Sequence, residues 1–318
     1  MKLALAGDTM LGRGVASALA ERSPKTLVAP EVVEAACDAD LFVLNLECCI
    51  SDLGRPWPDP TKPFFFRAPP AAIEVLTHIG VDCVTLANNH ALDFGAEALL
   101  DTFEHLRAAG IAWAGAGENA EAAQAPVVLE EAGRRLAVIA VSDHPHEYAA
   151  GTEAGIAFAD LRQAEPPEWL LTTIRGADAD EVLVTPHWGP NMRAEPVPQV
   201  RRAAESIVQA GASLVAGHSA HVFHGVSGRV LYDLGDFLDD YAVDPLLRND
   251  LGLLFLVTLD GPNPRRLEAI PLKLDYCHTR LAEGEDAGWI RRRFRDACAV
   301  LGTEVREDNG RLVIEGLA

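Results

Sequence analysis

Short apolar runs alternate with amphipathic helical patterns along the first two-thirds of the chain, and this alternation restricts the possible folds more than any other feature. It is typical of α/β folds, in which helices cover a largely parallel sheet. The apolar runs predict strands at Lys2–Ala6, Asp40–Leu46, Cys83–Ala87, Ile111–Ala114, Arg135–Val141, Glu181–Pro186, Ser213–Ala216, Arg229–Tyr232, Leu253–Thr258 and Leu267–Lys273. The helical patterns lie at Gly14–Arg22, Pro70–Ile79, Ala96–Ala109, Glu118–Gln124, Glu165–Ile174, Val197–Ala210 and Asp286–Leu301.

The chain shows no internal repeat and no break in composition, so we expect one domain over residues 1–318 in which two sheets share a core. Residues 241–318 are rich in predicted strands, and we expect them to complete the second sheet and to add a helix. The Pro-rich stretch Asp52–Pro70 is predicted to be a loop insertion. Its segment Trp57–Phe66 is either a lid over a site or a plug that packs into the core.

The charge balance limits the partners. Lys and Arg total 27 against 47 Asp and Glu, which gives a formal net charge of -20. Such a chain repels nucleic-acid phosphates and anionic membrane surfaces, so neither is expected as a partner. An anionic substrate would need a local source of positive charge, either a few arginines or a metal ion.

The sequence also bears on the compartment. Only a few apolar residues lie between Lys2 and Asp8, too few for the core of a signal peptide. No run approaches the ~20 apolar residues of a membrane-spanning helix. The six cysteines include no CxxC pair, and free thiols are the rule in reducing compartments. We therefore expect a cytoplasmic protein with no membrane span.

Polar residues repeatedly follow the predicted strands. Ligands of open α/β folds bind at the carboxyl ends of strands, where the loops converge. Each of these residues alone has an ordinary explanation, such as a helix cap, a turn or a packed core histidine, but their joint placement favours a site. The residues are Asp8, Glu47, Asn88, Asn89, His90, His187, His218 and His221.

These residue types favour a metal site. Carboxylate, amide and imidazole groups suit divalent ions such as Mn, Fe or Zn, and a bridging carboxylate can serve two ions. No Walker A, GxSxG or HExxH motif is present. Cys48 and Cys49 flank Glu47 without a positive neighbour in sequence, so we expect buried, inert thiols there.

An ordered set of short motifs resembles the CapA family of capsule and poly-γ-glutamate biosynthesis proteins. The resemblance spans about residues 1–240 and implies the calcineurin-like metallophosphoesterase fold, a four-layer αββα sandwich with a metal site at the carboxyl ends of the strands. The motifs are Gly7-Asp8-Thr9-Met10, Asn45-Leu46-Glu47, Phe66-Arg67-Ala68-Pro69-Pro70, Ala87-Asn88-Asn89-His90-Ala91-Leu92-Asp93-Phe94-Gly95, His187-Trp188-Gly189, Gly217-His218-Ser219-Ala220-His221-Val222 and Leu234-Gly235-Asp236-Phe237.

The resemblance implies roles for individual residues and one or two bound ions. His90 matches the histidine that donates a proton to a leaving group. The implied metal ligands are Asp8, Glu47 in place of a bridging aspartate, Asn89, His187, His218 and His221. Three positions depart from the pattern. Met10 replaces a ligand histidine, one extra residue separates His218 from His221, and Asp236 replaces an asparagine. Because Met10 supplies no ligand at that position, the resemblance implies that one of the metal sites binds its ion less tightly. Ca is therefore an alternative ion to Mn, Zn and Fe.

The leading hypothesis is a metal-dependent enzyme with hydrolase-like chemistry on a small phosphate- or carboxylate-bearing substrate, γ-glutamyl peptides included. His90 and Asp8 would be catalytic. His90 would donate or accept the proton, because imidazole titrates near neutral pH. The residues expected to bind the substrate are Asn88, Arg67 and Arg193. The two arginines are candidates because a guanidinium pairs bidentately with a carboxylate.

Two alternatives stay open. One is an epimerase acting on the C-terminal residue of a peptide, in which His90 with Asp8 works on one face and His278 on the other. The second is a non-enzymatic subunit of a polymer synthesis or export system, for which the metal fold would be a scaffold.

Overall fold

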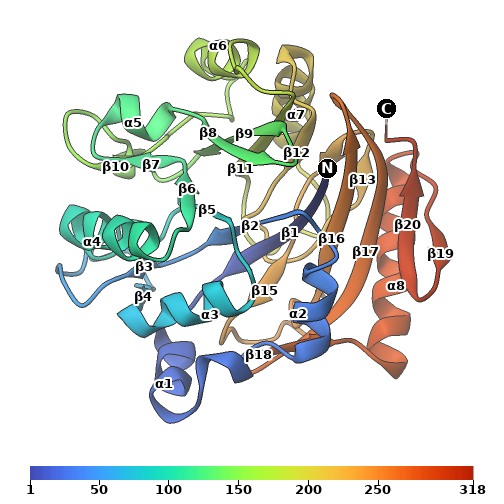
Figure 1. Cartoon of the computed structure of the whole chain (residues 1–318), viewed down its shortest axis with the longest axis horizontal. Helices are drawn as coiled ribbons and strands as arrows, with labels where there is room; N and C mark the ends of the chain where they lie inside the picture. The colour runs from blue at the N-terminus through green and yellow to red at the C-terminus, as the bar shows by residue number, and fades with distance from the viewer. Residues whose placement is uncertain (318) are drawn as a thin grey trace.

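Two large β-sheets form the centre of the computed structural model, which describes residues 1–317 (Figure 1). The larger sheet has the strand order β19-β20-β17-β16-β1-β2-β5-β6, with β15 added beside β1 and β18 beside β17. Its strands are β1 (Lys2–Thr9), β2 (Leu41–Leu46), β5 (Cys83–Thr85), β6 (Ala112–Ala114), β15 (Asp236–Leu238), β16 (Leu251–Asp260), β17 (Asn263–Asp275), β18 (His278–Leu281), β19 (Arg306–Asp308) and β20 (Arg311–Glu315).

The second sheet has six strands in the order β13-β14-β12-β11-β9-β8. They are β8 (Val127–Glu131), β9 (Arg134–Ser142), β11 (Glu181–His187), β12 (Leu214–Ala216), β13 (Val226–Ser227) and β14 (Val230–Leu231). Two small pairs complete the strands: β3 (Cys49–Ile50) with β4 (Arg67–Ala68), and β7 (Ala116–Gly117) with β10 (Gly155–Ile156).

Helices cover the outer face of each sheet (Figure 1). On the larger sheet lie α1 (Arg13–Glu21), α2 (Pro30–Ala36), α3 (Ile73–His78) and α4 (Gly95–Ala108). On the second sheet lie α6 (Glu168–Arg175) and α7 (Pro198–Ala210), and α5 (Ala120–Gln124) packs nearby. Helix α8 (Gly284–Val300) contributes Ile290 and Phe294 to the core between the sheets. Short 3₁₀ turns occupy Pro24–Thr26, Pro70–Ala72 and His146–Tyr148.

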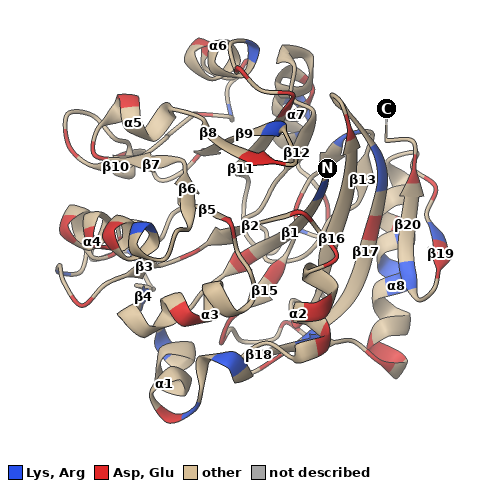
Figure 2. Ribbon diagram, in the orientation of Figure 1, with Lys and Arg blue, Asp and Glu red and all other residues tan. Residues whose placement is uncertain are grey.

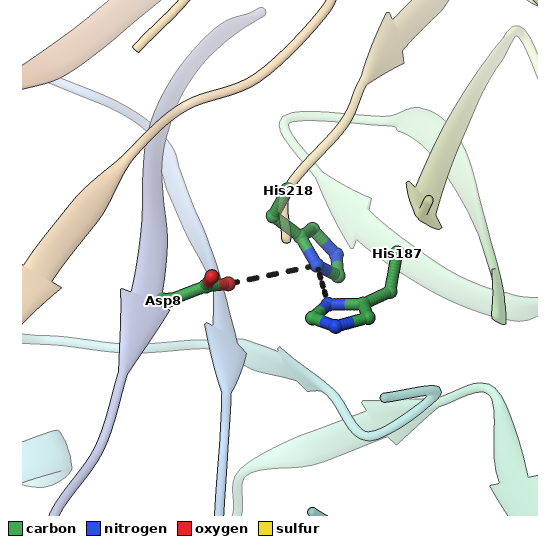
Figure 3. A group of neighbouring side chains, drawn as sticks. All are labelled: Asp8, His187 and His218. Carbon is green, nitrogen blue, oxygen red and sulfur yellow. Dashed lines mark hydrogen bonds and ion pairs between the residues drawn. The ribbon is translucent and has the colours of Figure 1, made fainter. Parts of the chain in front are cut away.

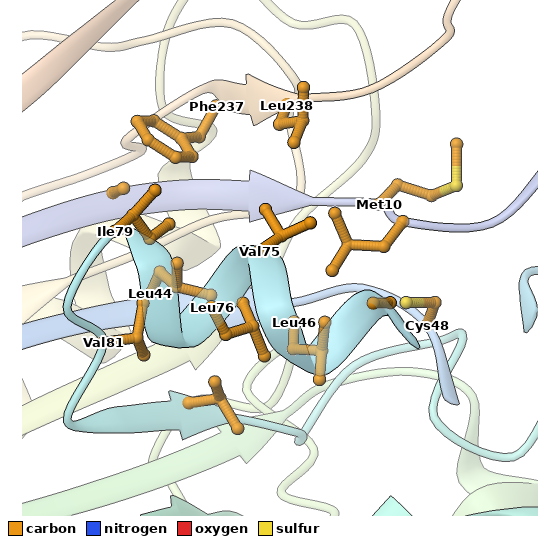
Figure 4. Packing of buried hydrophobic residues seen from close by; sticks show 14 of the residues in the cluster. Met10, Leu44, Leu46, Cys48, Val75, Leu76, Ile79, Val81, Phe237 and Leu238 are labelled. Atoms are coloured by element: carbon orange, nitrogen blue, oxygen red, sulfur yellow. The ribbon is translucent and has the colours of Figure 1, made fainter. Parts of the chain in front are cut away.

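Alternating side chains of the central strands build separate cores on their two faces, as the period of a strand requires. In β1, Leu3 and Leu5 point into the core between the sheets, whereas Ala4 and Ala6 point into the helix-side core. Figure 4 shows part of this helix-side core, where Val75 and Leu76 of α3 pack on the strands. The layers therefore run helix, sheet, sheet, helix, and the predicted αββα fold is confirmed.

The strand-rich segment 241–318 corrects one expectation. It was predicted to complete the second sheet, but β16 pairs antiparallel with β1, and β17 and β20 follow it outward in the larger sheet. The reason lies in the free edge of β1, which pairs with β2 on its other side. The second sheet is bounded beyond β12 by the short β13–β14 hairpin.

The charged residues are spread over many elements rather than gathered on one (Figure 2). Asp8 and Glu47 are exceptions to the usual surface placement of carboxylates, because neither has any exposed surface. None of the helices among residues 1–317 is long and apolar enough to span a membrane.

Candidate metal centre

The ends of strands from both sheets meet at one place and bring the strand-end residues together, as expected. Asp8 lies near the end of β1, and Glu47 directly follows β2. Asn88–His90 lie after β5. His187 is the last residue of β11, and a parallel bridge joins it to His218 beyond β12.

Asp8, His187 and His218 form a first buried cluster (Figure 3). The Nδ1 atoms of the two histidines lie 2.7 Å apart, and Nδ1 of His218 lies 3.6 Å from Oδ1 of Asp8. Each residue is at most 1% exposed. A carboxylate and two imidazoles that face one another out of water are a donor set typical of Zn, Mn or Fe sites.

Asp8, His221 and Asp236 form a second cluster that shares Asp8 with the first. Nδ1 of His221 lies 2.8 Å from Oδ1 of Asp236 and 3.3 Å from Oδ2 of Asp8. Strand β15 places Asp236 directly beside Asp8 on β1. Asp236 was noted in the sequence as a departure from the family pattern but was not predicted as a ligand. The second cluster is richer in oxygen than the first.

Four buried oxygens around the clusters have no hydrogen-bond partner. They are Oδ2 of Asp8, Oε1 of Glu47, Oδ1 of Asn89 and Oδ2 of Asp236. Buried polar atoms are normally paired, and an orphaned one costs about 1–3 kcal/mol. Because all four can donate electron pairs to a cation, the donor set fits a divalent metal.

The electrostatics of the site agree with this fit. Burial and the negative charge of Asp8 raise the pKa of Glu47 to about 8. Burial lowers the pKa of His218 to about 4 and the pKa of His187 well below its usual range, in spite of the carboxylate of Asp8 near His218. Burial also opposes protonation of His221, but Asp236 and Glu47 outweigh it and raise the His221 pKa. A cation would relieve the repulsion between Asp8 and Glu47.

Glu47 and Met10 occupy different surroundings. Oε1 of Glu47 lies 4.0 Å from Nε2 of His187, and Oε2 accepts a hydrogen bond of 2.8 Å from the Tyr241 hydroxyl. Met10 instead packs in the helix-side core (Figure 4). Its sulfur accepts a bond from the Gly12 amide. Glu47 therefore faces the first cluster, whereas Met10, at the position of the family's histidine, supplies no ligand atom to either cluster.

His90 lies beside the clusters and is held by Asp93. Nδ1 of His90 lies 2.6 Å from Oδ2 of Asp93, and the His90 ring stacks on Phe66 with centroids 3.8 Å apart. Asp93 also accepts bonds from the Phe66 amide, the Tyr148 hydroxyl and the Lys62 ammonium. Burial lowers the pKa of His90 to about 4, so the ring is neutral and donates through Nδ1. Its Nε2 is then the ring nitrogen that can accept a proton.

Asn88 holds the strand ends together. Its amide nitrogen donates to Oδ1 of Asn45 and to the carbonyl of Leu46, and its Oδ1 accepts from the His90 amide. Asn45 in turn donates to Oδ1 of Asp8 over 2.8 Å. This network links three strand ends and fixes the direction of Asp8.

The other predicted substrate residues are not brought to the clusters. Arg67 donates to the Leu53 carbonyl and lies over the Phe94 ring, 4.2 Å from its centroid. The carbonyl of Arg193 accepts a bond from His224. His278 lies on β18 beside Asp275.

Cys48 and Cys49 are buried as expected, and burial raises the pKa of Cys49 to about 12. Sequence reasoning missed Asp93, Lys62 and Tyr241. The Asp93 signal was its position three residues after His90, whereas Lys62 and Tyr241 reach the site through long-range contacts that no local pattern marks.

The model of a protein family described as "Bacterial capsule synthesis protein PGA_cap" matches residues 2–241. A "Probable polyglutamine synthesis accessory protein" of Mycobacterium tuberculosis is 29% identical over 303 residues, covering 85% of this chain and 76% of the relative. The capsule biosynthesis protein CapA of Bacillus anthracis is 27% identical over 257 residues. That alignment covers 76% of this chain and 60% of the relative.

Similarity to solved structures is weaker. A hypothetical protein from Thermus thermophilus has a TM-score of 0.49 at 14% identity, over 86% of this chain and 99% of that chain. The NAD nucleotidase of Haemophilus influenzae has a TM-score of 0.41 at 10% identity, over 89% of this chain and 49% of that chain.

Proposed function

Since the chain belongs to the bacterial capsule synthesis protein family PGA_cap, we propose that it is a metal-dependent hydrolase acting on a phosphate- or carboxylate-bearing substrate in capsule or polyglutamate synthesis. One observation carries the proposal. Two clusters share Asp8, and four buried oxygens around them lack any hydrogen-bond partner. Such a site is costly without a cation and favourable with one.

Two adjacent groups of residues would hold the ions. His187, His218, Glu47 and Asn89 join Asp8 around the nitrogen-rich cluster, and Asp236 and His221 join it around the oxygen-rich cluster. The first group favours Zn, Mn or Fe, and the second also suits Ca. A bound ion would polarise an anionic oxygen of the substrate and lower the pKa of a water ligand.

His90 would move the proton. Asp93 holds Nδ1 and thereby directs Nε2 away from the carboxylate, and Phe66 fixes the plane of the ring. A neutral imidazole in this orientation accepts a proton at Nε2 and can return it to a leaving group. The residues of the chain thus supply both an anion-binding centre and an oriented proton carrier.

The proposal is tested by assaying the purified full chain on chromogenic phosphoesters and on γ-glutamyl peptides, before and after treatment with a chelator. We expect turnover that disappears with the chelator and returns when Mn²⁺ is added back. Turnover that is insensitive to the chelator would contradict the proposal.

Two further outcomes separate the alternatives. Deuterium incorporated at a substrate Cα in D₂O, without hydrolysis, would favour an epimerase. Bound metal without turnover of any substrate would favour an accessory role, as the name of the mycobacterial relative suggests for that protein.

A further inference from the structure

A pocket of about 490 Å³ adjoins the candidate metal centre. Asn89, whose Oδ1 is one of the orphaned oxygens, lines it together with His144. The His144 ring lies 5.2 Å from the ring of His187, measured between centroids, so the inner wall of the pocket touches the first cluster. The volume is within the range of small-molecule sites.

Lys62 is the lysine that lines this pocket, and it comes from the Pro-rich insertion. Its ammonium donates to the Asn89 carbonyl over 2.8 Å and lies 3.0 Å from Oδ1 of Asp93. An ammonium has three N–H donors, and these two contacts use two of them. The Lys62 side chain is 13% exposed, so the remaining donor has access to the pocket.

Lys62 forms an ion pair with Asp93, but Asp93 has other hydrogen-bond donors as well. Asp93 already accepts bonds from His90 and the Phe66 amide, both at 2.6 Å, and from the Tyr148 hydroxyl at 3.0 Å. A buried carboxylate with three such donors is well satisfied. Lys62 is thus not needed to complete the hydrogen bonds of Asp93, and its third N–H is left for a ligand in the pocket.

The remaining walls restrict the ligand. Trp57 and Tyr148 form an aromatic pair with centroids 4.8 Å apart, and both line the pocket. Asp59 and Glu147 line it as well, and their carboxylates oppose a ligand that carries many negative charges. The pocket thus suits one anionic group on an uncharged stem.

We propose that this pocket binds the substrate and that Lys62, rather than Arg67 or Arg193, holds a single terminal carboxylate or phosphate next to the metal ligands. This inference rests on the proposed function and adds to it a substrate class and a binding residue. The insertion then acts as a wall of the site, with Lys62 on the pocket and Phe66 under His90.

The test is calorimetric titration of the Mn²⁺-loaded full chain with inorganic phosphate and, separately, with N-acetylalanine, which distinguishes the two anion chemistries. N-acetylalaninamide, which lacks the charge, is the ligand control. The variants are Lys62→Met, Lys62→Arg and, as a matched control, Arg67→Met, which removes a cation that lies over Phe94. Manganese content and the unfolding midpoint are measured on the same samples.

We expect at least one of the two anions to bind the wild type and the amide not to bind. Lys62→Met should weaken anion binding about tenfold or more, because a charge-assisted hydrogen bond is lost. Lys62→Arg should keep more of the affinity than Lys62→Met, and Arg67→Met should leave it unchanged.

Equal affinity in folded, manganese-loaded wild type and Lys62→Met would overturn this inference and leave the proposed function standing. Failure of both anions to bind the loaded wild type would also overturn it. A wild type that holds no manganese would contradict the proposed function itself, and this inference with it.

Discussion

At the scale of single residues, the contact between Asp93 and His90 decides whether the imidazole can work. The 2.6 Å contact fixes the proton on Nδ1 and leaves Nε2 free. Asp93→Asn keeps the size of the side chain but removes the acceptor charge. We expect kcat to fall about a hundredfold, the lower end of the range for general acid–base groups, with a smaller change in KM.

A control variant and a double variant are measured in the same kcat assay. Asp101→Asn removes a carboxylate on α4 that accepts a bond from Ser51, and it should leave kcat unchanged. Adding His90→Gln to Asp93→Asn should cost much less than His90→Gln costs alone, because the two residues act as a unit. Fully additive losses would show that Asp93 does not act through His90.

His224 makes stability depend on pH. Its Nε2 lies 2.8 Å from the Arg193 carbonyl, and burial lowers its pKa to about 4 from a usual 6.5. Between these pH values the unfolded chain binds a proton that the folded chain does not, so stability falls as the pH drops through this window. From pH 7 to pH 5 this residue should account for a loss of about 2 kcal/mol.

His224→Gln removes the titration and should lose about 2 kcal/mol less than the wild type over the same pH interval, as urea unfolding would measure. Parallel pH profiles for the two proteins would show that His224 is not buried as a neutral ring.

At the scale of elements, the close approach of β1 and β15 sets the distance between Asp8 and Asp236. A Cβ atom at Gly7 would lie 1.8 Å from the Gly235 carbonyl oxygen, so the backbone must move to admit one. We expect Gly7→Ala to lower the free energy of unfolding by about 3 kcal/mol or more.

Replacing a glycine by alanine on α8 should instead raise the free energy of unfolding. A Cβ at Gly288 would meet only the flexible end of Arg292, at 3.5 Å, and alanine is the better helix former. Gly288→Ala should therefore stabilise the chain by about 0.5–1 kcal/mol. If both variants shifted the unfolding midpoint alike, the close approach of β1 and β15 would be refuted.

Elements with strong periodic patterns could be predicted from the sequence. The strand predicted at Arg135–Val141 is β9 (Arg134–Ser142), because its apolar side chains face two cores and leave a long apolar run. Helix α2 was missed because it has only seven residues. Strand β8 was missed because it is a half-exposed edge strand.

The candidate ligands were predictable for a related reason: parallel strands carry their carboxyl ends to one edge whatever the details of packing. Long flexible side chains were not predictable. Arg67 was expected at the substrate and lies over Phe94, whereas Lys62, in the same insertion, reaches Asn89. Such contacts depend on how a loop folds back, and no spacing in the sequence encodes that.

At the scale of the whole molecule, the two sheets are joined by the core between them and by the candidate metal centre. Asp8, Asp236 and Glu47 come from the larger sheet, and His187 and His218 from the second. A cation held by both would bind the folded chain and not the unfolded one. At a concentration a hundred times its Kd it should stabilise the chain by about 2.7 kcal/mol.

This stabilisation is measurable by thermal unfolding of chelator-treated protein with and without Mn²⁺. The midpoint should rise as Mn²⁺ is added, whereas His187→Ala should show a smaller rise. An unchanged midpoint in the wild type would contradict a metal that links the sheets.

The acidic residues behind the net charge of -20 fall into two groups, one dispersed over the fold and one buried at the site. Most of the acidic side chains are dispersed over the elements, as Figure 2 shows, but Asp8, Glu47 and Asp236 are buried together at the strand ends. That buried part of the negative charge is the part that the proposed function explains.

The most direct test of the central claim is elemental analysis of the native full chain beside its Asp8→Asn variant. Asp8 belongs to both clusters, and the substitution removes its charge while Asn45 can still donate to the remaining oxygen. We expect at least one divalent ion per wild-type chain and almost none in the folded variant. A wild type that contains no metal and takes up none, or a variant that holds as much as the wild type, would contradict the claim.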